Sequence, residues 1–402
     1  MTIRRGFLSD YFNGVAVKRL SAVEANALRS NQHEFNSSNQ LKAMLGTPAR
    51  VSYKARFLWL GGEQDSLSED GFLTWYESRK PPRSEHRLYF PTNSICAIAS
   101  EGDALFIARR TDDTLMAIVA PGGSTIESQL LWLFGLDDQG KFNFAEIKGG
   151  SAELDFAARC IFDELGIEIE ESETDFLDNL LAPLGGRFPS TATFSALARQ
   201  SLPNVDPRDG ADAALMAWLE REEALFRRME RSIVSERLKT GFIGGADADV
   251  DGFIAFSLAV QNRRKSRAGY SLENHLDTIF RAEKLRFDRG AVTEGKAKPD
   301  FLFPGSAEYH DAAFPAERLT LLGSKSSCKD RWRQVLSESA RIERKHLVTL
   351  EPSISESQTT EMQAHKLQLV LPHELHATYR PAQQSWLMDI EGFIAMAKGR
   401  QG

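Results

Sequence analysis

Short apolar runs that end at turn-forming residues dominate the first 150 residues of the chain. Ala55–Leu60, Ala104–Ala108 and Leu115–Ala120 are each followed closely by Gly, Asp or Pro, and Leu88–Phe90 and Ile95–Ala99 have the same character. Many short strands with this punctuation are typical of β-sandwiches and β-barrels. We therefore expect a mostly β domain in which each of these five runs is a strand.

The pattern changes to helical spacing after residue 150. Ala152–Leu165 repeats apolar residues at helical intervals and is followed by Gly166, a residue that commonly terminates helices. Asp209–Lys239 is a longer amphipathic stretch that stops before Gly241. Both stretches predict helices.

The last 150 residues alternate between the two patterns and predict a mixed α/β unit. The expected helices are Asp251–Val260, Ser271–Glu283 and Lys329–Arg344, and the expected strands are Phe301–Phe303, Leu319–Leu322, His346–Leu350 and Leu367–Leu371.

A chain of 402 residues has room for two or three domains. We predict an N-terminal domain over residues 1–170, a linker over 171–190 and a C-terminal domain over 191–402. The chain has no run of about 18 apolar residues and no apolar segment near its start, so we expect no membrane association and a cytoplasmic protein. Its three cysteines, at positions 96, 160 and 328, are too scattered for a disulfide framework or a zinc cluster.

The formal net charge of −7 argues, taken whole, against a nucleic-acid partner, but the charge is unevenly distributed. Residues 1–100 carry a net charge of +4 and residues 261–345 carry +6, whereas residues 101–260 carry −15. Charge blocks of this kind are also common on solvated surfaces, so they do not decide the partner.

Three residues between positions 300 and 338 could support phosphodiester hydrolysis. Asp300 opens an apolar strand, Lys325 follows the next strand, and Glu338 lies on the helix predicted after it. Asp300 and Glu338 would hold Mg²⁺, which stabilises the negative charge that develops at phosphorus, and Lys325 would orient the attacking water. Glu273, on the preceding predicted helix, could supply a further carboxylate.

Two basic segments flank these residues. Asn262–Gly269 predicts a basic turn whose side chains contact the DNA backbone, namely Arg263, Arg264, Lys265 and Arg267. Lys329, Asp330 and Arg331 offer donors for guanine and an acceptor for cytosine, a set suited to reading G·C pairs.

The segments Asn262–Gly269, Thr293–Gly295, Lys298–Pro304 and Ser327–Gln334 resemble the catalytic domain of the EcoRII-type restriction endonucleases. The resemblance implies a PD-(D/E)XK nuclease fold that cleaves at a site built on CC and GG, such as CCWGG or CCNGG. It also implies that Asp300, Lys325, Glu338 and Glu273 are catalytic and that Lys329, Asp330 and Arg331 read bases.

A looser resemblance to the effector domain of the same family covers part of the N-terminal region. It implies a B3-like pseudobarrel that binds a second copy of the DNA site. The residues that it assigns to effector DNA are Asn31, Gln32, His33, Arg79, Arg83, Glu85, His86 and Arg87.

The leading interpretation is a homodimeric, Mg²⁺-dependent type II restriction endonuclease acting on double-stranded DNA, with type IIE regulation left open. A cognate cytosine methyltransferase would protect the host DNA. The main alternative is a sequence-specific DNA-binding regulator that has lost cleavage, and a nicking repair enzyme is a weaker one. The presence of both Asp300 and Lys325 counts against loss of cleavage.

Overall fold

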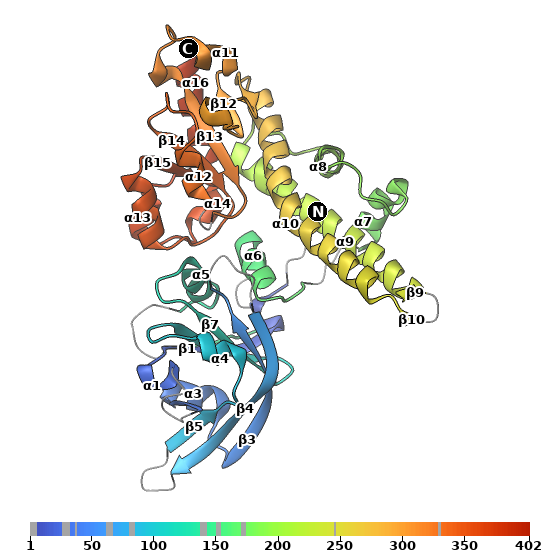
Figure 1. Ribbon diagram of the computed structural model, residues 1–402, viewed down its shortest axis with the longest axis vertical. Helices are drawn as coiled ribbons and strands as arrows, with labels where there is room; N and C mark the ends of the chain where they lie inside the picture. Colours follow the sequence, from blue (N-terminus) through green and yellow to red (C-terminus); the bar gives the residue numbers. More distant parts are fainter. Residues whose placement is uncertain are drawn as a thin grey trace. The chain divides into compact units, whose positions relative to one another are not determined.

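The computed structural model divides into two compact units (Figure 1). One unit comprises Met1–Glu170 with Pro352–Thr359, and the other comprises Glu171–Glu351 with Thr360–Gly402. The structure describes residues 6–25, 33–36, 38–61, 67–79, 85–136, 143–149, 154–169, 174–244, 247–328 and 331–402.

The N-terminal unit is built on an eight-stranded sheet with the order β2-β5-β4-β3-β7-β6-β1-β8, in which only the β3–β7 pair is parallel. Its strands are β1 (Phe12–Arg19), β2 (Glu34–Asn36), β3 (Arg50–Trp59), β4 (Leu67–Arg79), β5 (Glu85–Tyr89), β6 (Ala104–Arg110), β7 (Leu115–Ala120) and β8 (Asn143–Glu146). Its helices are α1 (Ala22–Ala25), α3 (Asn39–Leu45), α4 (Ser94–Ile98), α5 (Thr125–Leu133) and α6 (Phe156–Glu164).

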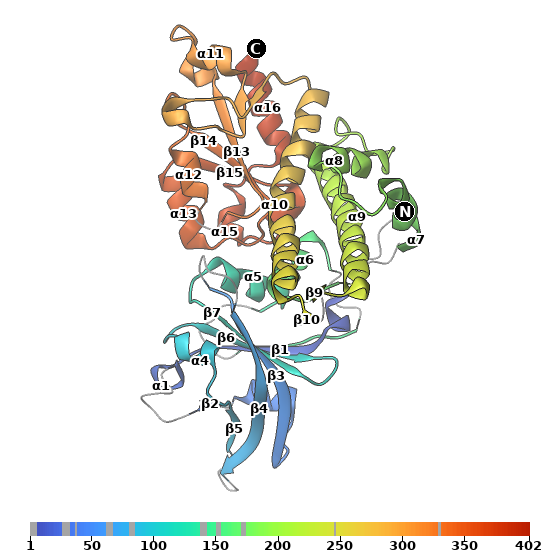
Figure 2. The ribbon, with the colours of Figure 1, turned by 45° about the vertical axis from the view of Figure 1, so that its right-hand side comes forward.

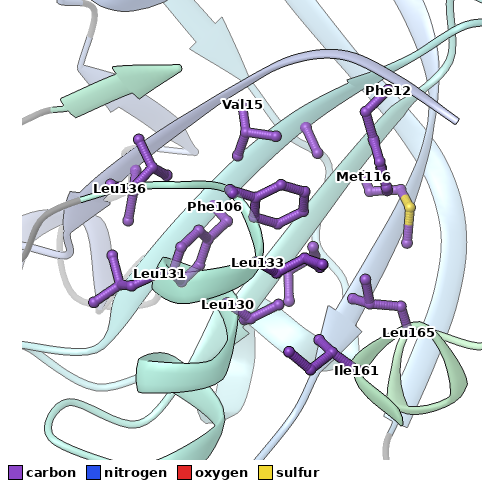
Figure 3. Close-up of a cluster of buried hydrophobic side chains, with 14 of the residues drawn as sticks. Phe12, Val15, Phe106, Met116, Leu130, Leu131, Leu133, Leu136, Ile161 and Leu165 are labelled. Carbon is purple, nitrogen blue, oxygen red and sulfur yellow. The ribbon is translucent and has the colours of Figure 1, made fainter. Parts of the chain in front are cut away.

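The central strands β1, β6 and β7 are buried along almost their whole length. Because alternate residues of a strand point to opposite faces of the sheet, these strands contribute to a core on each face. Val15 and Phe106 on one face share a cluster with Leu130 of α5 and Ile161 of α6 (Figure 3). The opposite face contributes to a second core around Trp75, which is fully buried. The eight-stranded sheet between these two cores confirms the predicted mostly β character of this unit.

One of the five predicted N-terminal strands is wrong. Ile95–Ala99 lies mainly in helix α4, which begins where the Asn93 side chain accepts a hydrogen bond of 2.8 Å from the Cys96 amide. A capping asparagine stabilises the first turn of a helix. This local interaction outweighs the strand pattern of the short apolar run.

The C-terminal unit contains a five-stranded sheet with the order β11-β12-β13-β14-β15. Strands β13, β14 and β15 are parallel, and β11 and β12 extend the sheet in antiparallel pairs. The strands are β11 (Asp288–Arg289), β12 (Phe301–Phe303), β13 (Thr320–Lys325), β14 (Lys345–Thr349) and β15 (Leu367–Val370). The four strands predicted in this region are confirmed.

Helices cover both faces of this sheet. On one face, Phe280 of α10 (Val250–Ala282) and Phe393 of α16 (Ile390–Gln401) contact Phe303 of β12. On the other face, α12 (Trp332–Leu336) approaches β13 so closely that a Cβ at Gly323 would lie 2.7 Å from the Val335 side chain. Glycine is therefore required at position 323.

The remaining helices of this unit are α7 (Thr174–Leu181), α8 (Thr191–Gln200), α9 (Ala211–Thr240), α11 (Ser306–His310), α14 (His373–His376) and α15 (Pro381–Gln384). Helix α13 (Glu356–Ala364) begins in the segment assigned to the N-terminal unit and continues into this one. Strand β9 (Ile243–Gly244) pairs with β10 (Asp247–Ala248). Residues 171–190, predicted as a linker, include α7, whose buried Leu177 and Leu181 join a cluster with Phe226 of α9. Residues 174–184 of this segment are therefore helical, and residues 185–190 form the irregular connection to α8. No helix in the described ranges is long and apolar enough to cross a membrane.

Helices α9 and α10 run side by side in both views (Figures 1 and 2). The sequence predicted two helices over Asp251–Val260 and Ser271–Glu283 with a basic turn between them, and this is wrong. Residues 250–282 form one continuous helix, since the arginines of the expected turn are paired with glutamates of α9.

The helix predicted over Lys329–Arg344 is also shorter than expected. Helix α12 covers only Trp332–Leu336, and Ser339 adopts a left-handed conformation with a φ of 55°. A non-glycine residue in this conformation cannot continue an α-helix. Glu338 therefore lies in a turn after the helix.

The continuity of α10 makes a testable prediction at Gly269. A Cβ at this position meets no atom within 4 Å, so Gly269→Ala should stabilise the protein by up to about 1 kcal/mol through the higher helix propensity of alanine. The matched control is Gly241→Ala, where a φ of 77° ends α9 and alanine should cost about 1–2 kcal/mol. Urea unfolding measures both, and destabilisation by Gly269→Ala would contradict a continuous helix.

Candidate active site

The pairing of β12 with β13 brings Asp300 and Lys325 together. Phe301 pairs with Leu322 in the antiparallel register, so Asp300, one residue before β12, reaches the end of β13. One oxygen of Asp300, Oδ2, accepts hydrogen bonds from the Ser324 amide at 2.6 Å and from Lys325 Nζ at 2.8 Å. Both side chains are about four-fifths buried, at 19% and 17% exposure, so the ion pair is shielded but accessible.

Glu338 reaches the same region from the turn after α12. Its pKa is raised by burial and by the negative charge of Asp300, and it is lowered to a smaller extent by Lys325 and Lys345. Its Oε2 atom is buried and has no hydrogen-bond partner among the described residues. A buried carboxylate oxygen without a partner is costly, and it is suited to accept a ligand.

Glu273 approaches from α10, on the other face of the sheet. Arg289 of β11 donates a hydrogen bond of 2.8 Å to Glu273 Oε2. Burial raises the pKa of Glu273, the charge of Asp300 raises it further, and Arg289 and Lys325 oppose the shift. The charges of Asp300 and Lys325 both act on Glu273, so Glu273 lies within electrostatic reach of that ion pair.

The donors in this site suit a hard divalent cation. Among the residues that the structure describes, no cluster of three or more His, Cys, Asp or Glu side chains is arranged to enclose a metal ion. Mg²⁺ is commonly held by one or two carboxylates, with water and substrate phosphate completing its coordination. The unpartnered oxygen of Glu338, whose carboxyl is within electrostatic reach of Asp300, fits that kind of site.

The predicted base-reading segment is only partly described. Lys329 and Asp330 lie outside the described residues. Arg331 is exposed, and its guanidinium donates a hydrogen bond of 2.9 Å to the Ser327 carbonyl. The Glu351 carboxylate accepts a hydrogen bond from the Cys328 amide and thereby fixes the start of this segment next to Lys325.

The four residues predicted to contact the DNA backbone lie on helix α10 and not on a turn. Arg264 pairs with Glu230 at 2.6 Å, Arg267 pairs with Glu223, and the Arg263 guanidinium stacks 4.6 Å above the ring of Phe188. Each arginine therefore has a structural partner within the helical layer. Lys265 is exposed.

Some of the predicted effector residues lie outside the described ranges, and others are held in ion pairs. Asn31, Gln32 and Arg83 lie outside the described residues. Arg87 is paired with Glu34 at 2.9 Å and with Glu85 at 3.1 Å, and Arg79 lies 3.4 Å from Glu85.

The two predicted effector histidines are held by aromatic side chains. His33 is half-buried against Phe90. His86 is buried, stacks on Trp75 and lies 3.2 Å from the Pro48 carbonyl. The His86 ring therefore presents almost no surface to a ligand in this structure.

Sequence reasoning missed several residues that support the site. Arg289 gave no signal, because a lone arginine after a helix is common. Glu294 lies in the Thr293–Gly295 segment used for the resemblance, but nothing in the sequence pairs it with Tyr309, which donates to both of its carboxylate oxygens at 2.7 and 2.6 Å.

The raised pKa of Glu338 predicts a pH-dependent cost to stability. The folded protein binds this proton more tightly than the unfolded chain, so the contribution of Glu338 favours folding at acidic pH and is lost as the pH rises through the raised pKa. Without metal, Glu338→Gln should therefore unfold at a higher urea concentration than the wild type at pH 7. The gain should vanish near about pH 4, where glutamate is largely protonated.

The control for this prediction is Glu343→Gln. Lys366 lowers the pKa of Glu343, so removing the Glu343 charge should not stabilise the protein at pH 7. Equal unfolding midpoints for wild type and Glu338→Gln at pH 7 would rule out the proposed charge crowding.

Part of the chain, including this site, is similar to known proteins. Residues 226–394 match the family model described as EcoRII C terminal. The chain is 41% identical over 216 residues to the type II restriction enzyme EcoRII of Escherichia coli. The aligned residues cover 53% of this chain and 51% of that enzyme. The chain thus spans about half the length of the curated relative that it matches.

Two solved structures are similar at lower identity. Metal-depleted Ecl18kI in complex with uncleaved DNA is 19% identical with a TM-score of 0.41, covering 57% of this chain and 84% of that one. The PspGI–substrate DNA complex is 12% identical with a TM-score of 0.44, covering 53% and 93%. The predicted resemblance to the EcoRII-type restriction endonucleases is therefore confirmed, through the family match and the sequence identity, for the C-terminal part of the chain.

Proposed function

We propose that this chain is a type II restriction endonuclease that hydrolyses double-stranded DNA at a short site containing CC and GG, in a Mg²⁺-dependent reaction. The observation that carries the proposal is the Asp300–Lys325 ion pair beside the unpartnered oxygen of Glu338. This arrangement lies within the region that matches the EcoRII C-terminal family.

Each residue of the site has a role in the proposed mechanism. Asp300 and Glu338 would hold Mg²⁺, and the bound ion supplies positive charge that stabilises the phosphoryl oxygens as negative charge develops on them. The Ser324 amide fixes the Asp300 carboxylate, and Lys325 Nζ, 2.8 Å from that carboxylate, orients the attacking water and the phosphate. Arg289 keeps Glu273 oriented toward the same region.

The wider assignment of the protein follows from the same resemblance. We infer a PD-(D/E)XK fold for the C-terminal unit, because its sheet carries Asp300 and Lys325 on adjacent strands with helices on both faces. We also infer a B3-like pseudobarrel for the N-terminal unit, a homodimer that matches a two-fold symmetric DNA site, and a separate cytosine methyltransferase. The proposed partner is double-stranded DNA, and the proposed effector surface includes Arg79, Glu85 and Arg87.

The proposed activity is tested on unmethylated plasmid DNA with purified protein and Mg²⁺. We expect discrete fragments, and sequencing their ends gives the site and the cut position together. Lys325→Ala should abolish cleavage but retain DNA binding, because it removes the group that orients the water. The matched control is Lys366→Ala, which removes an exposed lysine that pairs with Glu343 and should cut normally.

Three results would count against this proposal. Folded wild-type protein that binds the site without cutting it would favour a DNA-binding regulator. Nicks restricted to mismatched DNA would favour a repair enzyme. Normal cleavage by Lys325→Ala would remove Lys325 from the mechanism.

Base reading by Arg331 makes a second prediction. The protein should discriminate between the cognate site and a site in which one G·C pair is changed. Arg331→Ala should reduce this difference in binding free energy by about 1–3 kcal/mol. The matched control is Arg333→Ala, because Arg333 is two residues away and is paired with both oxygens of Glu361 at 2.9 Å. Binding to both DNA duplexes is measured at one salt concentration, and equal loss of discrimination by both variants would refute a specific role for Arg331.

A further inference from the structure

The turn that carries Glu338 is held in an unfavourable backbone conformation. Ser339, the next residue, has a φ of 55° and is buried. The left-handed region costs a non-glycine residue roughly 1–2 kcal/mol, so surrounding contacts must hold it there. Those contacts decide where the Glu338 carboxylate lies.

Glu294 provides the contact from one side. This residue lies in the 3-10 helix Glu294–Lys296, and its Oε2 atom accepts a hydrogen bond of 3.2 Å from the Ala340 amide. The same carboxylate accepts from the Tyr309 hydroxyl through both oxygens. Tyr309 is buried, so its ring fixes the direction from which Glu294 is held.

Arg341 provides the contact from the other side of the turn. Its guanidinium donates to the Asp311 carbonyl at 2.9 Å and to the Phe314 carbonyl at 2.7 Å, and it also bonds the Tyr309 carbonyl. The turn is therefore tied to the segment after β12 through Tyr309, Glu294 and Arg341. Removal of Glu294 leaves the Ala340 amide without this acceptor but keeps the Arg341 contacts.

The same groups are electrostatically linked to Glu338. Lys345 Nζ donates a hydrogen bond of 2.7 Å to the Ile342 carbonyl, within the segment that leads from this turn into β14. Both Glu338 and Glu294 raise the pKa of Lys345 against the lowering effect of its burial. The negative charges of Glu294 and Glu338 therefore both act on the Lys345 ammonium group.

We propose that Glu294 is a positioning residue for Glu338: by binding the Ala340 amide while Tyr309 orients it, Glu294 holds the turn that places the Glu338 carboxylate beside Asp300. Glu294 is not assigned contact with DNA or metal in this inference. The inference rests on the proposed role of Glu338 in holding Mg²⁺. Outer groups that orient a metal ligand typically affect metal affinity by 10–100-fold.

The test is the Mg²⁺ dependence of DNA cleavage by the full chain. Glu294→Ala should raise the half-saturating Mg²⁺ concentration by about tenfold, and the cleavage rate at saturating Mg²⁺ should recover. Glu294→Gln should give a smaller increase, because the amide oxygen still accepts a hydrogen bond. Tyr309→Phe should resemble Glu294→Ala, since it removes the donor that orients the carboxylate. DNA binding measured in EDTA should stay within about twofold of the wild type, because such binding depends on phosphate and base contacts.

Tyr379→Phe controls for simple loss of stability. Tyr379 is also buried, and its hydroxyl donates a hydrogen bond of 2.6 Å to a backbone carbonyl, that of Glu351. This variant should lower the melting temperature without changing the half-saturating Mg²⁺ concentration. A wild-type Mg²⁺ dependence in both Glu294 variants, or an equal shift in Tyr379→Phe, would overturn the positioning role.

The proposed function and this inference fail in different ways. Absence of cleavage by the wild type at any Mg²⁺ concentration would refute the proposed function itself. An unchanged Mg²⁺ dependence in Glu338→Gln would refute the role of Glu338, and with it this inference. If Glu338→Gln raises the Mg²⁺ requirement but the Glu294 variants do not, only the inference about Glu294 is refuted.

Discussion

The contact between Asp300 and the end of β13 organises the candidate active site. A single carboxylate oxygen accepts from the Ser324 amide and from the Lys325 ammonium group, so the antiparallel register of two strands fixes an acid and a base relative to each other. Hydrogen bonds to charged groups are stronger than neutral ones. Because these donors belong to one strand, the geometry depends on backbone pairing more than on the packing of long side chains.

The site concentrates negative charge that the protein alone does not fully neutralise. Burial and Asp300 raise the pKa of both Glu273 and Glu338. Arg289 and Lys325 oppose the shift of Glu273, and Lys325 and Lys345 oppose that of Glu338. Functional sites commonly retain such unfavourable electrostatics, because the same arrangement binds a cation or a substrate. The carboxylates come from the residue before β12, from the turn after α12 and from α10, so each one is held by a different element.

The sequence was sufficient where a local pattern determines the structure. The apolar runs of β12, β13, β14 and β15 predicted strands correctly, and Asp300 and Lys325 followed from their positions at the strand ends. The errors have tertiary or conformational causes: Arg264 and Arg267 pair with glutamates of another helix, and Ser339 leaves the helical region. The bond between Tyr309 and Glu294 spans 15 residues and carries no local signal.

The uninterrupted course of α10 has a mechanical consequence. With 33 residues, this helix extends over roughly 50 Å, from exposed Val250 and Ile254 at its beginning to Glu273 and buried Leu276 beside the sheet. The helix is unbroken between these two ends, and Arg264 and Arg267 tie its middle to α9. The position of Glu273 is therefore tied to the orientation of surface residues five turns away.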